Sequence, residues 1–294
     1  MNDVDHPAID KNGEAVLPPL PPWIGEANIA VWDLETTGLE PGKDRITQIA
    51  VIHVNHGQPV SEWQTFVNPG IPIPAEVTAI TGTTDEMVKH APAFAEVRAE
   101  VLWRLGLRAT GRRRLAVAYN GLHFDVPFLR AELLRTSDGV HDQATGVLTD
   151  CPEIQVFDPI IAVRIVDRYV KSEIPGQGRH KLAQVAKRHG LEVLRAHGAL
   201  TDSWMAWGVL RVMASHYYKW GVRSTSDLWP WQTRTSEAQE RDYLAYKAKK
   251  AREDAESEAG GGGYSRGTDR GLSANELDHA YRDPAWEDDA GRGG

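Results

Sequence analysis

The sequence predicts an α/β fold in which a mixed sheet, with three antiparallel strands plus parallel strands, carries helices on both faces. Three segments with the apolar character of strands come first, and a turn at 55–58 joins the second to the third. Segments with helical periodicity then alternate with short apolar runs. The chain has 294 residues, 41% of them hydrophobic, which suffices for one such domain with extensions at both ends.

The expected elements follow in chain order. The first three strands cover 28–33, 45–54 and 62–67, and a proline-rich loop follows at 68–74. A helical stripe marks 93–107, and 115–119 is a short buried strand. We expect the next helix to begin near Pro127, because proline suits a first helical turn. The remaining elements are a short strand at 154–157 and helices at 159–169, 180–189 and 200–215.

The composition divides the chain into four parts. We expect a disordered proline-rich arm over 1–25, the folded domain over 26–220, a C-terminal helical extension over 221–259, and a glycine linker with a disordered acidic tail over 260–294. In the extension, Ser236 and Gln239 have the spacing of a capping box for a helix over 236–258. In the tail, Leu277 and Tyr281 lie four residues apart, a spacing that suits a partner-docking helix, although a purely solubilising tail also fits.

The charge and cysteine content exclude several classes of protein. The net charge is −8, but the acidic excess lies in the first 26 and the last 24 residues, so the middle of the chain is neutral. This balance permits a nucleic-acid substrate and gives no support for a long basic footprint. The single cysteine, Cys151, excludes an internal disulfide and a cysteine-based zinc site. No apolar run has the length of a membrane span and no signal peptide is apparent, so we expect a cytoplasmic protein without membrane contact.

Two acids end the first buried strand. Asp33 and Glu35 are separated by one residue, and side chains two apart in a strand point the same way. Carboxylates held this close repel unless something neutralises them. Mg²⁺ and Mn²⁺ prefer hard oxygen ligands, so a divalent cation suits the pair. The alternative is a chance pair of outward-facing, solvated acids.

Two further motifs place polar residues at the ends of core elements. In the first, Asn120 ends a buried strand and Asp125 precedes a helix, where an acid also serves as an ordinary N-cap. In the second, His197 lies five positions before Asp202. The alternative for this motif is a loop histidine and a first-turn acid favoured by the helix dipole.

Taken in order, the three motifs resemble those of the DEDDh 3′–5′ exonucleases. This family includes the proofreading epsilon subunit of bacterial DNA polymerase III, ribonuclease T and oligoribonuclease. The resemblance spans roughly 27–215 and rests on 31–39, 120–125 and 197–202. One departure is Thr81, where many relatives have a histidine, and this position is not among the five catalytic ones. The resemblance implies a ribonuclease H-like fold.

The resemblance also implies roles for individual residues. Two divalent cations, Mg²⁺ or Mn²⁺, would be held by Asp33, Glu35, Asp125 and Asp202, and His197 would be the general base. A neutral imidazole can take a proton from water near physiological pH. The implied substrate-binding residues are Thr36, Thr37, Leu39, Asn120 and Phe124. For Leu39 and Phe124, ordinary core packing is an equal alternative.

The expected function is metal-dependent release of nucleoside monophosphates from the 3′ ends of single-stranded DNA, as in proofreading or repair. A DNA polymerase or another replication protein is then a candidate partner. An exoribonuclease of the ribonuclease T or oligoribonuclease type remains open, because no motif shows how the 2′-hydroxyl is met. A non-catalytic binding module is a third hypothesis, and the intact set of four acids and one histidine argues against it.

Overall fold

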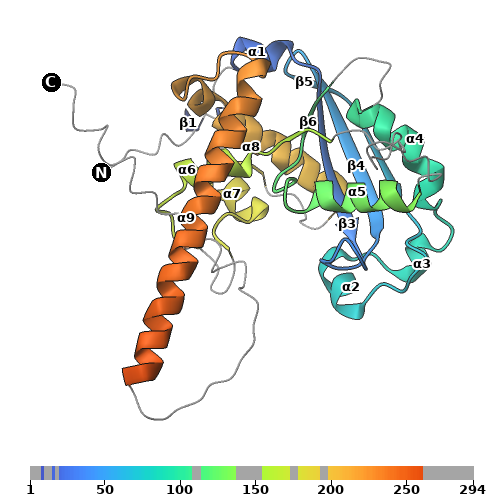
Figure 1. Cartoon of the computed structure of the whole chain (residues 1–294). Helices are drawn as coiled ribbons and strands as arrows, with labels where there is room; N and C mark the ends of the chain where they lie inside the picture. Colours follow the sequence, from blue (N-terminus) through green and yellow to red (C-terminus); the bar gives the residue numbers. More distant parts are fainter. Residues whose placement is uncertain are drawn as a thin grey trace, which may run out of the picture.

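The computed structural model describes residues 8–9, 15–16, 20–107, 114–136, 154–172, 178–192 and 198–260 (Figure 1). The strands are β1 (Ala8–Ile9), β2 (Ala15–Val16), β3 (Ile29–Thr36), β4 (Ile46–Asn55), β5 (Gln58–Phe66), β6 (Leu115–Val117) and β7 (Val156–Phe157). The helices are α1 (Pro22–Glu26), α2 (Ala75–Thr81), α3 (Asp85–Val88), α4 (Phe94–Leu105), α5 (Asp125–Arg135), α6 (Ile160–Val166), α7 (Leu182–Arg188), α8 (Ala199–Lys219) and α9 (Thr225–Gly260).

The central sheet has five strands in the order β5-β4-β3-β6-β7. The first three strands along the chain pair antiparallel, whereas β6 and β7 run parallel to β3. Each strand lies within a few residues of its expected range. The predicted mixed sheet of three antiparallel strands plus parallel ones is therefore confirmed.

Both faces of the sheet are covered, as predicted, because β3 alternates its side chains between two apolar cores. Ile29 and Val31 pack toward α8 and α6, in a core that also includes Leu210. Ala30, Trp32 and Leu34 face the opposite core, which is built with Phe94, Val101, Leu105, Phe128, Leu129 and Leu133 of α4 and α5. Figure 1 shows α5 crossing in front of the sheet and α8 behind it. Burial on both faces explains the near-continuous apolar sequence of β3.

The C-terminal extension differs from its expected form. The helix begins at Thr225, so Ser236 and Gln239 lie inside α9 and the predicted capping box is wrong. Buried Leu228 and Trp231 hold the first turns against the core, even though Pro230 removes one helical hydrogen bond. Trp231 stacks on Trp220 with ring centroids 5.4 Å apart.

The first part of the chain contains short elements. β1 and β2 pair antiparallel within the segment expected as an arm, and α1 follows at its end. Trp23 and Ile24 of α1 are buried in the α8 core, where Trp23 meets Tyr217 edge to face at 6.1 Å. Among the described helices, none is both long and apolar enough to cross a membrane. Cys151, His197, Leu277 and Tyr281 lie outside the described residues.

The packing of α9 predicts how much of the C-terminus the fold needs. Gln239 is the last buried side chain among those described, so a chain ending after Glu258 should unfold cooperatively with nearly unchanged stability. A chain ending after Arg223 lacks Leu228 and Trp231 and should lose more than about 3 kcal/mol, the usual cost of removing large buried side chains. Urea denaturation of both chains tests this, and an equal loss in the two would contradict it.

Candidate active site

The end of β3 extends past its parallel neighbour. β6 pairs with β3 only as far as Val31, so Asp33 and Glu35 lie on the part of the strand that β6 does not cover. Both acids project from the same face as Ile29 and Val31, the face covered by α8, and both are partly buried. An irregularity in the pairing with β4 falls between Glu35 and Thr36. Such irregularities commonly re-aim side chains beside functional sites.

The third acid comes from the first turn of α8. Asp33, Glu35 and Asp202 each offer a carboxylate oxygen, and these oxygens all lie within 4.8 Å of one another. The sequence motifs thus bring together three of the four acids as predicted. His197 lies just outside the described residues, next to Gly198 at the start of this helix.

Asp125 lies beside this cluster, at the start of α5. It is almost completely buried, and its Oδ1 accepts a hydrogen bond from the Leu34 N–H at 3.1 Å. Leu34 lies beyond the part of β3 that pairs with β6, so a side chain meets its amide where β6 has ended. This hydrogen bond ties the fourth predicted acid directly to the strand that carries the first two.

The cluster is electrostatically unfavourable in the absence of a cation. Burial, together with three neighbouring carboxylates, raises the pKa of Asp33 well above its ordinary value. Burial and the charge of Asp202 raise the pKa of Glu35 to about 8. Burial and the charge of Asp158 raise the pKa of Asp125, although the Leu34 N–H opposes this shift. The raised pKa values mean that these carboxylates need a positive charge beside them. Because all the donor atoms are oxygens, a hard divalent cation suits the site.

Asp158 organises the turn that leads to Asp125, a role that no motif in the sequence predicted. Its carboxylate accepts hydrogen bonds from the N–H groups of Asn120 at 2.8 Å and Leu122 at 3.3 Å. Asn120 has a positive φ of 60°, and a Cβ added at Gly121 would lie 2.4 Å from the Cβ of Ala118. The turn is therefore tight, and Asp158 satisfies the amides that it exposes.

The start of α8 is fixed by a residue of β4. The Gln48 Oε1 accepts the N–H of Ala199 at 3.2 Å, one of the helix-terminal amides that lack an intrahelical partner. Gln48 lies opposite Glu35 in the strand register. This bond therefore holds the helix carrying Asp202 against the strand carrying Glu35.

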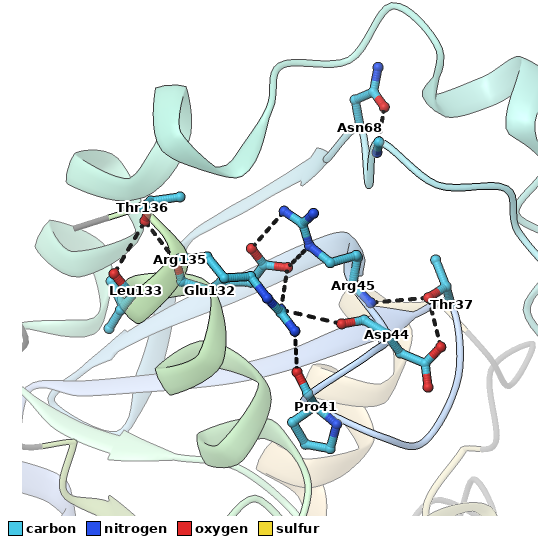
Figure 2. A network of polar contacts seen from close by, with 10 residues as sticks. Thr37, Pro41, Asp44, Arg45, Asn68, Glu132, Leu133, Arg135 and Thr136 are labelled. Atoms are coloured by element: carbon cyan, nitrogen blue, oxygen red, sulfur yellow. Dashed lines mark hydrogen bonds and ion pairs between the residues drawn. The ribbon is translucent and has the colours of Figure 1, made fainter. Parts of the chain in front are cut away.

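The loop between β3 and β4 is clamped to α5, as Figure 2 shows. Glu132 is buried and receives Arg45 Nε at 2.6 Å and Nη2 at 3.0 Å. Arg135 bonds the same carboxylate and the backbone carbonyls of Pro41 and Asp44. The clamp fixes the loop that follows Glu35 relative to the helix that begins at Asp125.

The predicted substrate-binding residues have different surroundings. The Thr36 hydroxyl donates to the Gly38 carbonyl, and the Thr37 hydroxyl donates to Asp44, so both hydroxyls are engaged within the loop. Leu39 is 80% exposed, which rules out the core-packing alternative for this residue. Phe124 is half-buried against Phe128, with ring centroids 5.0 Å apart, so core packing accounts for much of its surface. Of the Asn120 backbone, the N–H is already bound to Asp158.

Comparison with known proteins identifies the family. Residues 30–210 match the RNase_T family, described as exonuclease. The chain belongs to this exonuclease family. The match includes Asp33, Glu35, Asp125 and Asp202, and it ends before α9 begins. The predictions of an exonuclease and of an exonuclease-type fold are therefore confirmed.

Individual relatives agree with this assignment. The exonuclease is 41% identical over 133 residues to a DNA polymerase III subunit epsilon-like protein of Rhodobacter capsulatus, covering 44% of this chain and 18% of that protein. It is 29% identical over 192 residues to the DNA polymerase III subunit epsilon of Treponema pallidum, covering 64% and 77%. The chain thus spans less than a fifth of the length of the Rhodobacter relative.

Solved structures support the fold. Escherichia coli exonuclease I in complex with a dT13 oligonucleotide superimposes with a TM-score of 0.53 at 17% identity, covering 66% of this chain and 42% of that one. This level of similarity establishes the ribonuclease H-like fold, and the roles of single residues still rest on their own geometry.

The clamp on the β3–β4 loop generates a stability prediction. Arg45→Met should destabilise the protein by about 2–3 kcal/mol, because the buried Glu132 keeps only one cationic partner. Lys43→Met is the matched control on the same loop, since the Lys43–Glu40 pair is exposed to solvent and its loss should cost much less. Urea denaturation measures both changes. Equal losses in the two variants would show that the clamp contributes no more to stability than an exposed ion pair does.

Proposed function

We propose that this exonuclease is a metal-dependent 3′–5′ enzyme that releases nucleoside monophosphates from the 3′ ends of single-stranded DNA. The observation that carries the proposal is the carboxylate cluster at the end of β3. Oxygens of Asp33, Glu35 and Asp202 lie within 4.8 Å of one another, and Asp125 adjoins them. A family match alone does not require such a site, because a non-catalytic relative can lose an acid and keep its fold.

The residues divide the chemistry among them. Asp33, Glu35 and Asp202 would hold divalent cations, with Asp125 contributing from α5. When bound, two Mg²⁺ or Mn²⁺ ions supply Lewis-acid activation and offset the charge on the leaving 3′ oxygen. His197 would take the proton from the attacking water, whose oxygen bonds to phosphorus as the bond to the leaving oxygen breaks. Exposed Leu39 is available to press against the terminal bases, as a stacking contact that tolerates any sequence.

The relatives favour DNA over RNA as the substrate. They are described as polymerase III epsilon proteins, and exonuclease I was solved with a DNA oligonucleotide. The same descriptions support a DNA polymerase as a partner of this chain. An RNA substrate would use the same cluster, so the substrate experiment includes RNA.

The test of the proposal is digestion of matched 5′-labelled DNA and RNA oligonucleotides with Mg²⁺ or Mn²⁺. Single-stranded DNA ending in a 3′-hydroxyl should be shortened from that end, and a 3′-phosphorylated strand should be spared. Asp33→Asn and Glu35→Gln remove one negative charge each while keeping side-chain size, and each should abolish cleavage, as should EDTA in the wild type.

The outcomes of this digestion separate the hypotheses. Faster loss of RNA than of DNA would replace the substrate and keep the mechanism. Nicking of a closed circular single strand would contradict the need for a free end. Activity of Asp33→Asn within tenfold of the wild type would exclude the proposed role of the cluster.

The proposed base gives a second prediction. His197→Ala should bind Mn²⁺ as the wild type does but lose roughly 10²–10⁴-fold in rate, the usual contribution of a general base. The acidic limb of its pH–rate profile should change as well. His90→Ala, an exposed histidine between α3 and α4, is the control and should retain full activity. A wild-type rate and profile in His197→Ala would assign the base to another group.

A further inference from the structure

The helix α9, which follows the part of the chain matched by the family, is hydrogen-bonded to the edge of the sheet. The match ends at residue 210, whereas α9 starts at Thr225. Figure 1 shows α9 running across the molecule and then extending past the other described elements. Among its described side chains, which run to residue 252, the buried ones all lie in the first half, and they are Leu228, Trp231, Gln232 and Gln239. Two of these four are glutamines, so the contact includes specific hydrogen bonds as well as apolar packing.

Gln232 completes the outer edge of the sheet. Among the described residues, β7 has β6 as its strand neighbour, and on its other side Val156 and Asp158 present a carbonyl and an N–H. The Gln232 Oε1 accepts the Asp158 N–H at 2.7 Å, and its Nε2 donates to the Val156 carbonyl at 2.9 Å. One side-chain amide therefore makes the pair of bonds that another strand would make, and both are buried.

The residue held in this way is the one that organises the site. Asp158 is fully buried, and its carboxylate accepts the amides of Asn120 and Leu122 in the turn before α5. It also accepts the N–H of Ile160 at 3.1 Å, at the start of α6. A continuous set of hydrogen bonds therefore runs from α9 through β7 to the turn that presents Asp125.

We propose that the first half of α9 belongs to the catalytic unit and that Gln232 is a positioning residue, acting through Asp158 on the turn that presents Asp125. The catalytic unit then continues beyond the boundary expected at residue 220, at least to Gln232. The consequence for metal binding rests on the proposed function of Asp125. The link from Gln232 to the turn is a property of the fold alone.

Gln239 provides a matched control for the experiment. It has the same side chain, lies on the same face of α9, and is 9% exposed compared with 6% for Gln232. Its Nε2 also donates to a backbone carbonyl, that of Ile161 at 3.0 Å, but it makes no bond to Asp158 in the described contacts. Loss of Gln239 should therefore reproduce the general cost of weakening α9 without disturbing the turn.

The test compares Gln232→Leu with Gln239→Leu in the full chain. Hydrogen exchange of peptides covering 118–126, measured without metal, should speed up in Gln232→Leu and stay unchanged in Gln239→Leu. The affinity for Mn²⁺, measured by electron paramagnetic resonance of the free ion, should fall about tenfold or more in Gln232→Leu only. Losses of this size are usual when a residue that supports a metal ligand is replaced. With an oligonucleotide substrate, Gln232→Leu should have a lower kcat than the wild type, and its KM should stay within twofold of the wild-type value.

Each outcome decides the proposal. Unchanged exchange over 118–126 in Gln232→Leu, or equal acceleration in both variants, would overturn the positioning role and leave α9 as general support. Faster exchange over 118–126 in Gln232→Leu, together with a wild-type protein that cleaves no oligonucleotide, would support the link from Gln232 to the turn and reject the proposed function. If Gln232→Leu does not unfold cooperatively, the milder pair Gln232→Asn and Gln239→Asn gives the same comparison, because both keep the amide and shorten the side chain.

Discussion

Mutual repulsion among partly buried carboxylates is the force that this fold has to oppose. Asp33, Glu35 and Asp202 come from two elements far apart in the sequence, and their oxygens lie within 4.8 Å of one another. Free to move, such groups would separate or stay protonated, as the raised pKa values of Asp33 and Glu35 indicate. They cannot separate because β3 is paired with β4 along its whole length and with β6 as far as Val31, and because α8 packs directly on it. The sheet and its covering helix thus supply the rigidity that the site needs before any cation arrives.

Each element that carries an acid has an anchor of its own. Gln48 of β4 holds the first amide of α8, and the Leu34 N–H holds Asp125. The β3–β4 loop is fixed by the Arg45–Glu132 pair, in which the positive charge meets a buried carboxylate. These anchors consist of amides and a locally compensated ion pair, so they determine position without neutralising the cluster. The negative charge of the cluster therefore stays available to a cation, which is how rigidity and metal affinity are compatible in one place.

Local patterns predicted much of this from the sequence. The period of two in β3 put Asp33 and Glu35 on one face, and that relation needs only neighbouring residues. The hydrogen bond from Ala199 to Gln48 joins positions 151 apart in the chain, and no local pattern encodes it. Glu132 did have a signal, because it falls on the apolar stripe of α5 with Phe128, Leu129 and Leu133. A charged residue on such a stripe requires a partner of opposite charge, so Glu132 predicts a cationic side chain opposite α5.

The error at α9 has a physical cause that also explains what the helix does. Between residues 240 and 252 the described side chains are exposed or half-buried, and the sequence is rich in alanine, glutamate, lysine and arginine, so local helix propensity favours this half. The first half has poorer propensity, including Pro230, and forms because Leu228 and Trp231 are buried. Propensity therefore located the part of the helix in which no described side chain is buried beyond Gln239, and it missed the start of the helix, which the core holds. The folded unit has to continue until the buried backbone groups at the edge of the sheet have hydrogen-bond partners. At the outer edge of β7 these groups are the Val156 carbonyl and the Asp158 N–H, and Gln232 of α9 binds both.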